Sequence, residues 1–336
     1  MPSEDGTKNA ANKERVEEAS VSTLHLLSFS YIGSSHTELG KPNQDYSHFE
    51  KEADTLFVAV GDGLGSCAFS DQGSQLVTRQ ITQKMRDSIV SERSERTSQP
   101  KEHVILRIGS LKISREHSNR ESVIHLLDKL DEDMFKTAFV KSIYEIRSEL
   151  ELLSTTTKLR LQPKAIQQIS PADFSKNDLH QIPVMHNKGD FASTCLFAMT
   201  DGKTIFSSHI GDGGIYLVCQ NRSELLVEPT KGDSLNETIP LTHDEWNDYL
   251  RIRVLDVPHD ALFLCLMTDG FAENISKPDP NPFFQRIVNE ASKRTKSDFI
   301  AWLGELNDYY ESRGFSDDDK TASFIFFQNI FEERSE

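Results

Sequence analysis

The chain has 336 residues, of which 37 are lysine or arginine and 53 are aspartate or glutamate, so its formal net charge is −16. This acidic excess argues against a nucleic-acid-binding protein, which normally presents a basic surface. Apolar runs stay well short of the roughly 18 residues that a membrane-spanning helix needs, so we expect no membrane partner. The length suits one large domain or two ordinary ones.

The N-terminal segment Met1–Ser20 is polar and charged and lacks the apolar stretch of a secretory signal. We therefore predict a disordered tail over residues 1–21. The cysteines lie far apart, and three of them sit inside apolar runs, namely Cys195, Cys219 and Cys265. Cysteines in such runs are typical of buried, reduced thiols, so we expect a cytoplasmic protein.

The first predicted strand, Leu24–Ile32, is followed by a loop from His36 to Tyr46, and a second apolar strand then leads into Gly61-Asp62-Gly63-Leu64-Gly65. The glycines leave the main chain open to a ligand. A carboxylate at such a strand end is well placed to bind a hard cation through oxygen. An Asp-Gly pair after a strand is also an ordinary turn, so the interpretation depends on whether the pattern recurs.

Helical periodicity follows this turn. A helix is predicted to begin at Ser70 or Asp71, because apolar residues follow at a spacing of four: Val77, Ile81, Met85 and Ile89.

The centre of the chain is polar at both ends. A polar break at Ser91–Lys101 precedes one or two amphipathic helices over Ser122–Leu153, and Thr155–Lys188 is irregular. We treat residues 91–188 as a helical and irregular insertion in a single domain that spans residues 22–330. Packed structure is the simplest expectation for the insertion, and a lid or a partner surface is the alternative.

The second half of the chain is rich in strands. A meander is predicted over Ser193–Thr200, Thr204–Ile210 and Ile215–Cys219, with Asp-Gly turns that favour hairpins. Later elements are a strand that ends at Asp269-Gly270, two helices, and a last strand preceded by three aspartates: Ala261–Thr268, Phe283–Lys293, Ser297–Glu311 and Ala322–Phe327.

Carboxylates stand at several of these strand ends. Asp62 and Asp269 each follow an apolar strand, and Asp319 precedes another. If the strands are neighbours, the three carboxylates meet at one edge and repel one another, which favours divalent cations between them. Ligation by oxygen alone favours Mg²⁺ or Mn²⁺. Two such ions about 3.5–4 Å apart could hold a bridging hydroxide that attacks a phosphoryl group directly.

Five segments in order resemble the metal-dependent serine/threonine protein phosphatases of type 2C (the PPM superfamily), in a divergent, bacterial-like branch. The segments are Asn43-Gln44-Asp45, VAVGDGLGS from Val58, ASTCLFAMTDGKTIFSSHIGDGGIYLV from Ala192, LMTDGFAEN from Leu266 and DDDKTASFIFF from Asp317. The resemblance implies an α+β fold, a four-layer α-β-β-α sandwich of two antiparallel sheets with flanking helices. It places a binuclear metal site at one end of the sandwich.

The resemblance also assigns roles to individual residues. It implies that Asp62 bridges two ions and that the Gly63 carbonyl coordinates one of them. Asp269 and Asp319 would hold the other ion, and Asp45 would orient metal-bound water. Ligands for a weaker third ion fall at two further positions: Asp190, whose register is ambiguous by one residue, and Glu273.

Three positions depart from the family pattern. Gln44 stands where many members have a metal-ligating glutamate, and an amide oxygen can coordinate an ion but brings no charge. Gly40 stands where the family has its phosphate-binding arginine, so Lys41 or His36 would have to supply the cation. The third departure is Leu64, which replaces a histidine that some members use as a general acid; His36, His209 or water would then protonate the leaving oxygen.

Simpler interpretations apply to several of these residues. Asp212, in a Gly-Asp-Gly-Gly turn, is expected to form a turn or a structural hydrogen bond. Asp317 and Asp318 are expected to be solvated. A loop histidine is the ordinary interpretation of His36, and a satisfied sheet histidine that of His209.

The sequence therefore predicts a metal-dependent phosphatase that acts on phosphoserine and phosphothreonine in proteins with Mn²⁺ or Mg²⁺. Its expected partners are phosphoproteins, including a serine/threonine kinase and its targets. The main alternative is a phosphatase-like regulatory module with little or no turnover. A third possibility is a hydrolase of small phosphoesters on the same fold.

Overall fold

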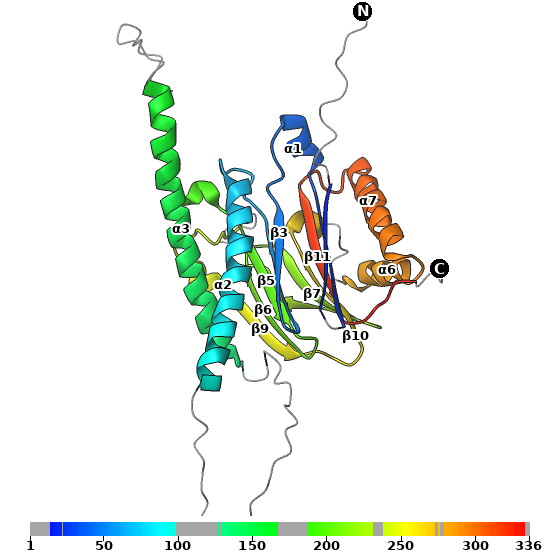
Figure 1. Cartoon of the computed structure of the whole chain (residues 1–336). Helices are drawn as coiled ribbons and strands as arrows, with labels where there is room; N and C mark the ends of the chain where they lie inside the picture. The colour runs from blue at the N-terminus through cyan, green and yellow to red at the C-terminus, as the bar shows by residue number, and fades with distance from the viewer. Residues whose placement is uncertain are drawn as a thin grey trace, which may run out of the picture.

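The computed structural model describes residues 14–21, 23–98, 127, 130–166, 187–230, 238–272, 275 and 279–332. Their strands form two antiparallel sheets that face each other, and helices cover both outer faces (Figure 1). The predicted four-layer α-β-β-α sandwich is confirmed. No helix in the described ranges is both long and apolar enough to cross a membrane.

The six-stranded sheet brings the two ends of the chain together. Strand β11 pairs with β2 although the two strands lie near opposite ends of the chain, as in the pairing of Tyr31 with Lys320. Its order is β1 (Glu14–Val21), β2 (Leu24–Tyr31), β11 (Lys320–Phe326), β10 (Ala261–Met267), β7 (Gly214–Cys219) and β8 (Ser223–Val227).

The five-stranded sheet contains the strand that leads to Asp62. Its order is β3 (Tyr46–Glu52), β4 (Thr55–Gly61), β5 (Cys195–Thr200), β6 (Thr204–Ile210) and β9 (Arg251–Asp256). The sequence of β4 is almost continuously apolar because both faces of the strand are buried. Leu56, Val58 and Val60 pack between the sheets, whereas Phe57 and Ala59 face the helices.

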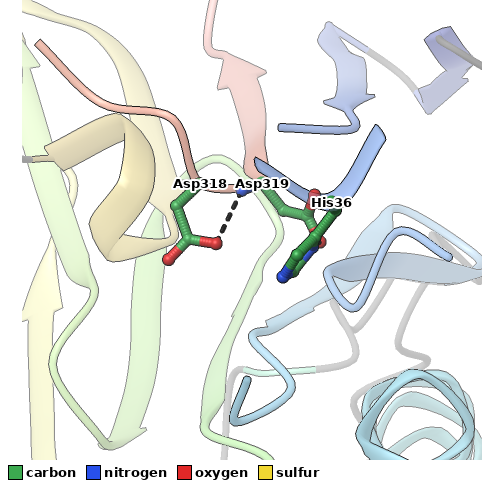
Figure 2. Close-up of side chains that lie close together, drawn as sticks. All are labelled: His36, Asp318 and Asp319. Atoms are coloured by element: carbon green, nitrogen blue, oxygen red, sulfur yellow. Dashed lines mark hydrogen bonds and ion pairs between the residues drawn. The ribbon is translucent and has the colours of Figure 1, made fainter. Parts of the chain in front are cut away.

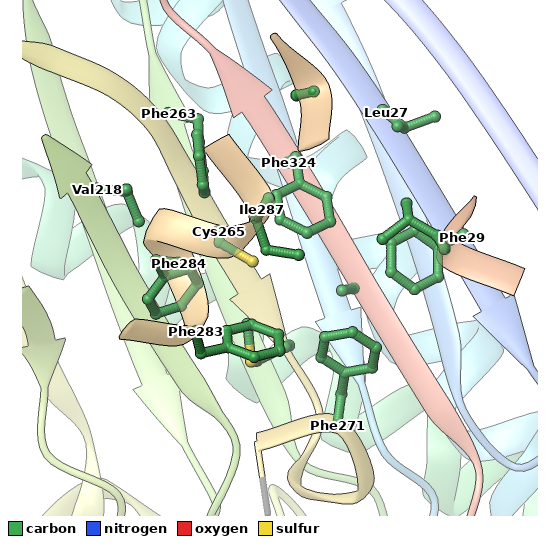
Figure 3. Close-up of a cluster of buried hydrophobic side chains, with 14 of the residues drawn as sticks. Leu27, Phe29, Val218, Phe263, Cys265, Phe271, Phe283, Phe284, Ile287 and Phe324 are labelled. Atoms are coloured by element: carbon green, nitrogen blue, oxygen red, sulfur yellow. The ribbon is translucent and has the colours of Figure 1, made fainter. Parts of the chain in front are cut away.

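Helices α2 (Ser70–Ser98) and α3 (Glu132–Ile166) cover the five-stranded sheet, and α6 (Asn281–Ala291) and α7 (Lys296–Ser312) cover the other. On the six-stranded side, a cluster of aromatic rings fills the interface (Figure 3). Shorter elements lie at the strand ends: α1 (Ser34–Leu39), η2 (Lys188–Phe191), α4 (Trp246–Tyr249) and α5 (Asp269–Ala272).

The predicted N-terminal tail is wrong over Glu14–Val21, which pairs with β2 along its whole length. Strand β1 is an edge strand, and most of its side chains are exposed or only partly buried. Edge strands often carry charged residues that discourage pairing with other chains, so the polar sequence hid the strand. Residues 1–13 lie outside the described residues.

Element boundaries in the central insertion also differ from the prediction. Helix α2 continues into the predicted polar break as far as Ser98, and α3 continues past Thr155 to Ile166. Residues 99–126 and 167–186 lie outside the described residues. The predicted loop after β2 begins with the short helix α1, which positions His36.

Candidate active site

Three carboxylates from different strand ends converge. Asp62 follows β4, Asp212 lies in the turn between β6 and β7, and Asp269 begins α5 after β10. One potential ligand atom from each lies within 4.8 Å of the others. Because β4 and β6 belong to one sheet and β7 and β10 to the other, the group spans the end of the sandwich where the sheets meet.

The turn that carries Asp62 is held on both sides. The Asp62 amide donates to Thr194 Oγ1 at 2.9 Å, and the Thr194 amide donates to the Asp62 carbonyl at 2.8 Å. The Gly63 amide donates to the Gln44 carbonyl at 3.1 Å. A Cβ at Gly63 would lie 2.6 Å from the Ser70 carbonyl oxygen, so this position needs glycine for close packing.

Electrostatics at Asp62 favour a counter-charge. Burial raises the pKa of the Asp62 carboxyl well above its usual value, and the charges of Asp45, Asp269 and Asp212 raise it further. The same charges repel each other in a site of low polarity. A bound cation would reverse this effect.

Asp45 lies beside the group and is almost fully buried, with 4% of its surface exposed. Thr268 Oγ1 donates to Asp45 Oδ2 at 2.7 Å, and the Asp45 amide donates to Asn43 Oδ1 at 2.9 Å. Burial raises the pKa of Asp45, the Asp319 charge adds to this, and the Thr268 hydrogen bond opposes it. The carboxylate therefore has a fixed position next to the cluster.

Asp319 has a different environment from Asp62. Its Oδ1 accepts from the Gly33 amide at 2.7 Å, and its Oδ2 accepts from the Gln44 amide at 2.6 Å and contacts His36 Nδ1 at 2.8 Å. Both side chains of the His36–Asp319 pair are buried. Asp319 thus ties α1 and the loop before β3 to the start of β11.

Asp318 lies beside the His36–Asp319 pair (Figure 2), and one potential ligand atom from each of the three residues lies within 4.8 Å of the others, which makes a second potential metal-binding group. Asp318 is exposed, and its Oδ1 accepts from the Asp319 amide at 2.9 Å. The Asp318 charge raises the pKa of both Asp62 and Asp45. Asp318 is solvent-exposed, as predicted, and its charge also acts on these two carboxylates.

Two buried oxygen atoms at the site have no hydrogen-bond donor among the described residues: Gln44 Oε1 and Asp212 Oδ1. The other oxygen of Asp212, Oδ2, accepts from Thr238. A Cβ on Gly65 would lie 3.7 Å from Gln44 Oε1, so this amide oxygen lies beside the turn after Asp62. Lys41 is exposed, and its Nζ donates to the Gly65 carbonyl at 3.3 Å, which puts one cation at the rim of the site.

The remaining predicted site residues are Asp190, Glu273 and His209. The Asp190 side chain accepts from the Asn187 amide at 2.7 Å and caps η2, and it belongs to neither of the potential metal-binding groups in the described part of the chain. Glu273 lies outside the described residues. His209 is fully buried in β6, and burial lowers its pKa to about 4, so the ring is neutral at pH 7.

Asp212 accepts a hydrogen bond and Asp318 is exposed, as predicted, but the sequence reasoning did not place either in a carboxylate group. The signal for Asp212 was present, because Gly211-Asp212-Gly213 after β6 repeats the pattern Gly61-Asp62-Gly63 after β4. For Asp318 no comparable signal existed within the run of three aspartates. The supporting hydroxyls of Thr194 and Thr268 were also not predicted.

Two facing antiparallel sheets, outer helices and a carboxylate cluster at one end define the sandwich class to which serine/threonine phosphatases belong. Residues 32–305 match the family model for protein phosphatase 2C, so the chain belongs to the protein phosphatase 2C family. The resemblance inferred from the sequence motifs is confirmed.

Solved structures agree on the fold. Serine-threonine phosphatase 2C from Toxoplasma gondii is 14% identical with a TM-score of 0.58, covering 93% of this chain and 98% of that one. The serine/threonine phosphatase Stp1 from Staphylococcus aureus is 12% identical with a TM-score of 0.53, covering 91% and 96%. A Caenorhabditis elegans sex-determining protein is 11% identical with a TM-score of 0.55, covering 92% and 66%. No curated protein sequence matches the chain.

Proposed function

We propose that this chain is a metal-dependent phosphatase that removes phosphate from phosphoserine and phosphothreonine in proteins. The observation that carries the proposal is the convergence of Asp62, Asp212 and Asp269 within 4.8 Å. Three carboxylates at one point have no evident structural purpose without a cation, because their mutual repulsion destabilises the fold. Membership of the protein phosphatase 2C family supports the same chemistry.

The residues at the site fit divalent cations. A buried acceptor without a donor costs about 1–3 kcal/mol, and both Gln44 Oε1 and Asp212 Oδ1 are in this state among the described residues. Because all the candidate metal ligands are oxygen atoms, the site suits Mn²⁺ or Mg²⁺. Asp62, Asp269 and the Gly63 carbonyl would hold two ions, with Asp212 and Gln44 as further ligands.

Asp318 fits the role of the remaining acidic metal ligand better than Asp319, the residue predicted for it. Both oxygens of Asp319 already serve the Gly33 and Gln44 amides and His36. Asp318 is exposed and acts electrostatically on Asp62. We therefore assign the metal-binding role to Asp318 and a positioning role to Asp319. Asp190 and Glu273 remain predicted ligands of a weaker third ion.

When bound, the cations would make a water molecule nucleophilic at neutral pH and offset the charge of the phosphoryl group. Asp45, fixed by Thr268, would orient the attacking water and accept a hydrogen bond from it. Lys41 at the rim would attract the phosphate as a point charge in place of the absent arginine. His36 or water would supply the proton for the leaving oxygen.

The proposed partners are phosphoproteins, including a serine/threonine kinase and its targets. All four cysteines are free, and Cys195, Cys219 and Cys265 are buried. Free thiols are typical of a reducing compartment, so we propose a cytoplasmic location.

The proposal is tested by hydrolysis of a phosphothreonine peptide with Mn²⁺, Mg²⁺ or EDTA. Metal-dependent turnover is expected in the wild type, with a loss of at least about 100-fold in Asp62→Asn and Asp269→Asn. Asp133→Asn on α3 removes one charge away from the site and should keep full activity. If the folded wild type turns over no phosphopeptide with either metal, the proposal is wrong.

A second candidate function is a phosphatase-like regulatory module that binds phosphoproteins without turnover. Its support is the absence of three family side chains, because Gly40, Gln44 and Leu64 replace an arginine, a glutamate and a histidine. Gly40 has φ of +65° and caps α1, so local backbone geometry favours glycine there. Phosphopeptide binding without hydrolysis in the assay above would establish this alternative.

A further inference from the structure

A pocket of about 370 Å³ lies beside α1. Residues at the ends of β1 and β2, on α1 and on α7 line it. The acidic members are Glu14, Glu38, Asp308 and Glu311, and Tyr31 and Asn307 are also in the lining.

The pocket carries an excess of negative charge. Glu311 Oε1 is paired with Lys320 Nζ at 3.4 Å, and the Lys320 side chain is fully buried. Within the described part of the chain, no lysine or arginine forms an ion pair with Glu14, Glu38 or Asp308. These three are exposed at the rim, so they can receive a cation from solution.

The lining also contains a buried acceptor for which the described residues supply no donor. Asn307 is only 5% exposed, and its Oδ1 has no hydrogen-bond partner among the described residues. The Tyr31 hydroxyl already donates to Glu14 Oε1 at 3.2 Å. Burial and the Glu14 charge raise the pKa of Tyr31, which keeps this hydroxyl protonated. The pocket therefore offers acceptors that a ligand with several donors would satisfy.

The spread of the carboxylates identifies the kind of cation. The described carboxylates that gather within 4.8 Å form two groups, and neither includes a residue of this pocket. A single metal ion would leave most of these acceptors out of reach. A guanidinium group presents five donors in a plane and suits separated carboxylate and amide oxygens. The Tyr31 ring and Ile32 provide an apolar wall for the aliphatic stem.

We propose that this pocket binds an arginine side chain of the phosphoprotein substrate. The inference rests on the proposed function, because it names the substrate class for the same site. Helix α1 contacts both the candidate active site and the pocket, through different residues. His36 contacts Asp319, whereas Ser34, Thr37 and Glu38 line the pocket. A helix is about 10 Å across and an extended chain advances about 3.3–3.6 Å per residue, so a substrate chain that spans the width of α1 would carry its arginine about three residues from the phosphorylated one.

The test measures binding of fluorescent peptides that carry a non-hydrolysable phosphonate analogue of phosphoserine, with 1 mM Mn²⁺ present. One arginine is moved through each of the five positions on either side, and an all-alanine flank serves as parent. We expect about fivefold tighter binding for arginine near the third position on one side, the size of two partly exposed ion pairs. The double variant Glu38→Gln/Asp308→Asn should reduce this preference to less than about twofold.

A matched control distinguishes the pocket from bulk charge. Glu132→Gln/Asp133→Asn removes the same charge from the start of α3 and should keep the full arginine preference. The proposal is overturned if no placement improves binding, if the preference survives the pocket variant, or if the control abolishes it equally. Turnover of a phosphothreonine peptide is measured in parallel: turnover without arginine preference rejects only the pocket, and arginine-dependent binding without turnover rejects only the enzyme.

Discussion

His36 Nδ1 lies 2.8 Å from Asp319 Oδ2, and this buried contact joins α1 to the start of β11. The same carboxylate accepts hydrogen bonds from the Gly33 and Gln44 amides. One side chain therefore holds three segments that surround the site. Its neighbour Asp318 shares none of these contacts and acts on Asp62 instead.

This difference predicts separate outcomes for the two aspartates. Asp319→Asn should lower the free energy of unfolding by about 2–4 kcal/mol, because one amide oxygen cannot replace a carboxylate with three donors. Asp318→Asn should leave metal-free stability within about 0.5 kcal/mol and weaken Mn²⁺ binding. Urea unfolding with EDTA measures stability, and calorimetric titration with Mn²⁺ measures affinity. An Asp319→Asn variant that keeps its stability but loses Mn²⁺ affinity would restore the role first predicted for that residue.

Lys41 is predicted to assist phosphate binding. Lys41→Ala should reduce kcat/KM for a phosphothreonine peptide by about fivefold, mainly through KM, because an exposed cation contributes modestly to attraction. The loss should shrink at high salt, which screens exposed charges. Lys51→Ala, at an exposed position on β3, provides the control. Equal losses in both variants would indicate an effect of net charge alone.

His209 makes stability dependent on pH. Burial lowers its pKa from an ordinary value of 6.5 to about 4, the Arg251 charge lowers it as well, and the Glu228 backbone partly opposes this. The unfolded chain therefore binds a proton at higher pH than the folded chain, so stability is lost as pH falls from about 6.5 to 4. Between pH 7 and pH 5 this residue accounts for a loss of about 2 kcal/mol.

The measurement compares urea unfolding at pH 7 and pH 5 for the wild type and His209→Gln. The variant, which cannot titrate there, should lose about 2 kcal/mol less than the wild type over this interval. The exposed His259, changed to Gln, serves as control and should behave like the wild type. Identical losses in all three proteins would show that another group controls the pH dependence.

The aromatic core beneath α6 should be sensitive to truncation. Phe263 lies within 5.4–6.2 Å of the rings of Phe284, Phe324 and Phe326, centroid to centroid, and is fully buried (Figure 3). Phe263→Ala should cost about 3–5 kcal/mol of stability in thermal or urea unfolding. Phe315→Ala should reduce stability far less, because the Phe315 side chain is 58% exposed. A small effect at Phe263 would mean that the neighbouring rings refill the cavity.

Much of the fold was determined by the sequence itself. The sequence shows apolar runs at the strands that are buried on two faces, namely β2, β4, β5, β6, β7, β10 and β11. The partly exposed strands β3, β8 and β9 were not predicted. The apolar face of α2 was predicted from the spacing of four between its apolar residues. These residues are at most 4% exposed: Val77, Ile81, Met85 and Ile89. Strand β1 was missed because an edge strand buries little and its sequence carries no apolar pattern.

The positions of Asp62 and Asp269 also followed from the sequence, since each comes directly after a buried strand. Only the tertiary structure decided the rest of the site. Asp212 joins the cluster because β6 and β7 lie in different sheets, so their connecting turn crosses the end of the sandwich. Asp318 and Asp319 point in different directions because successive side chains near a strand alternate. A candidate metal ligand and a structural carboxylate therefore occupy adjacent positions in the chain. Only the packing of β11 against its neighbours decides which aspartate has which role.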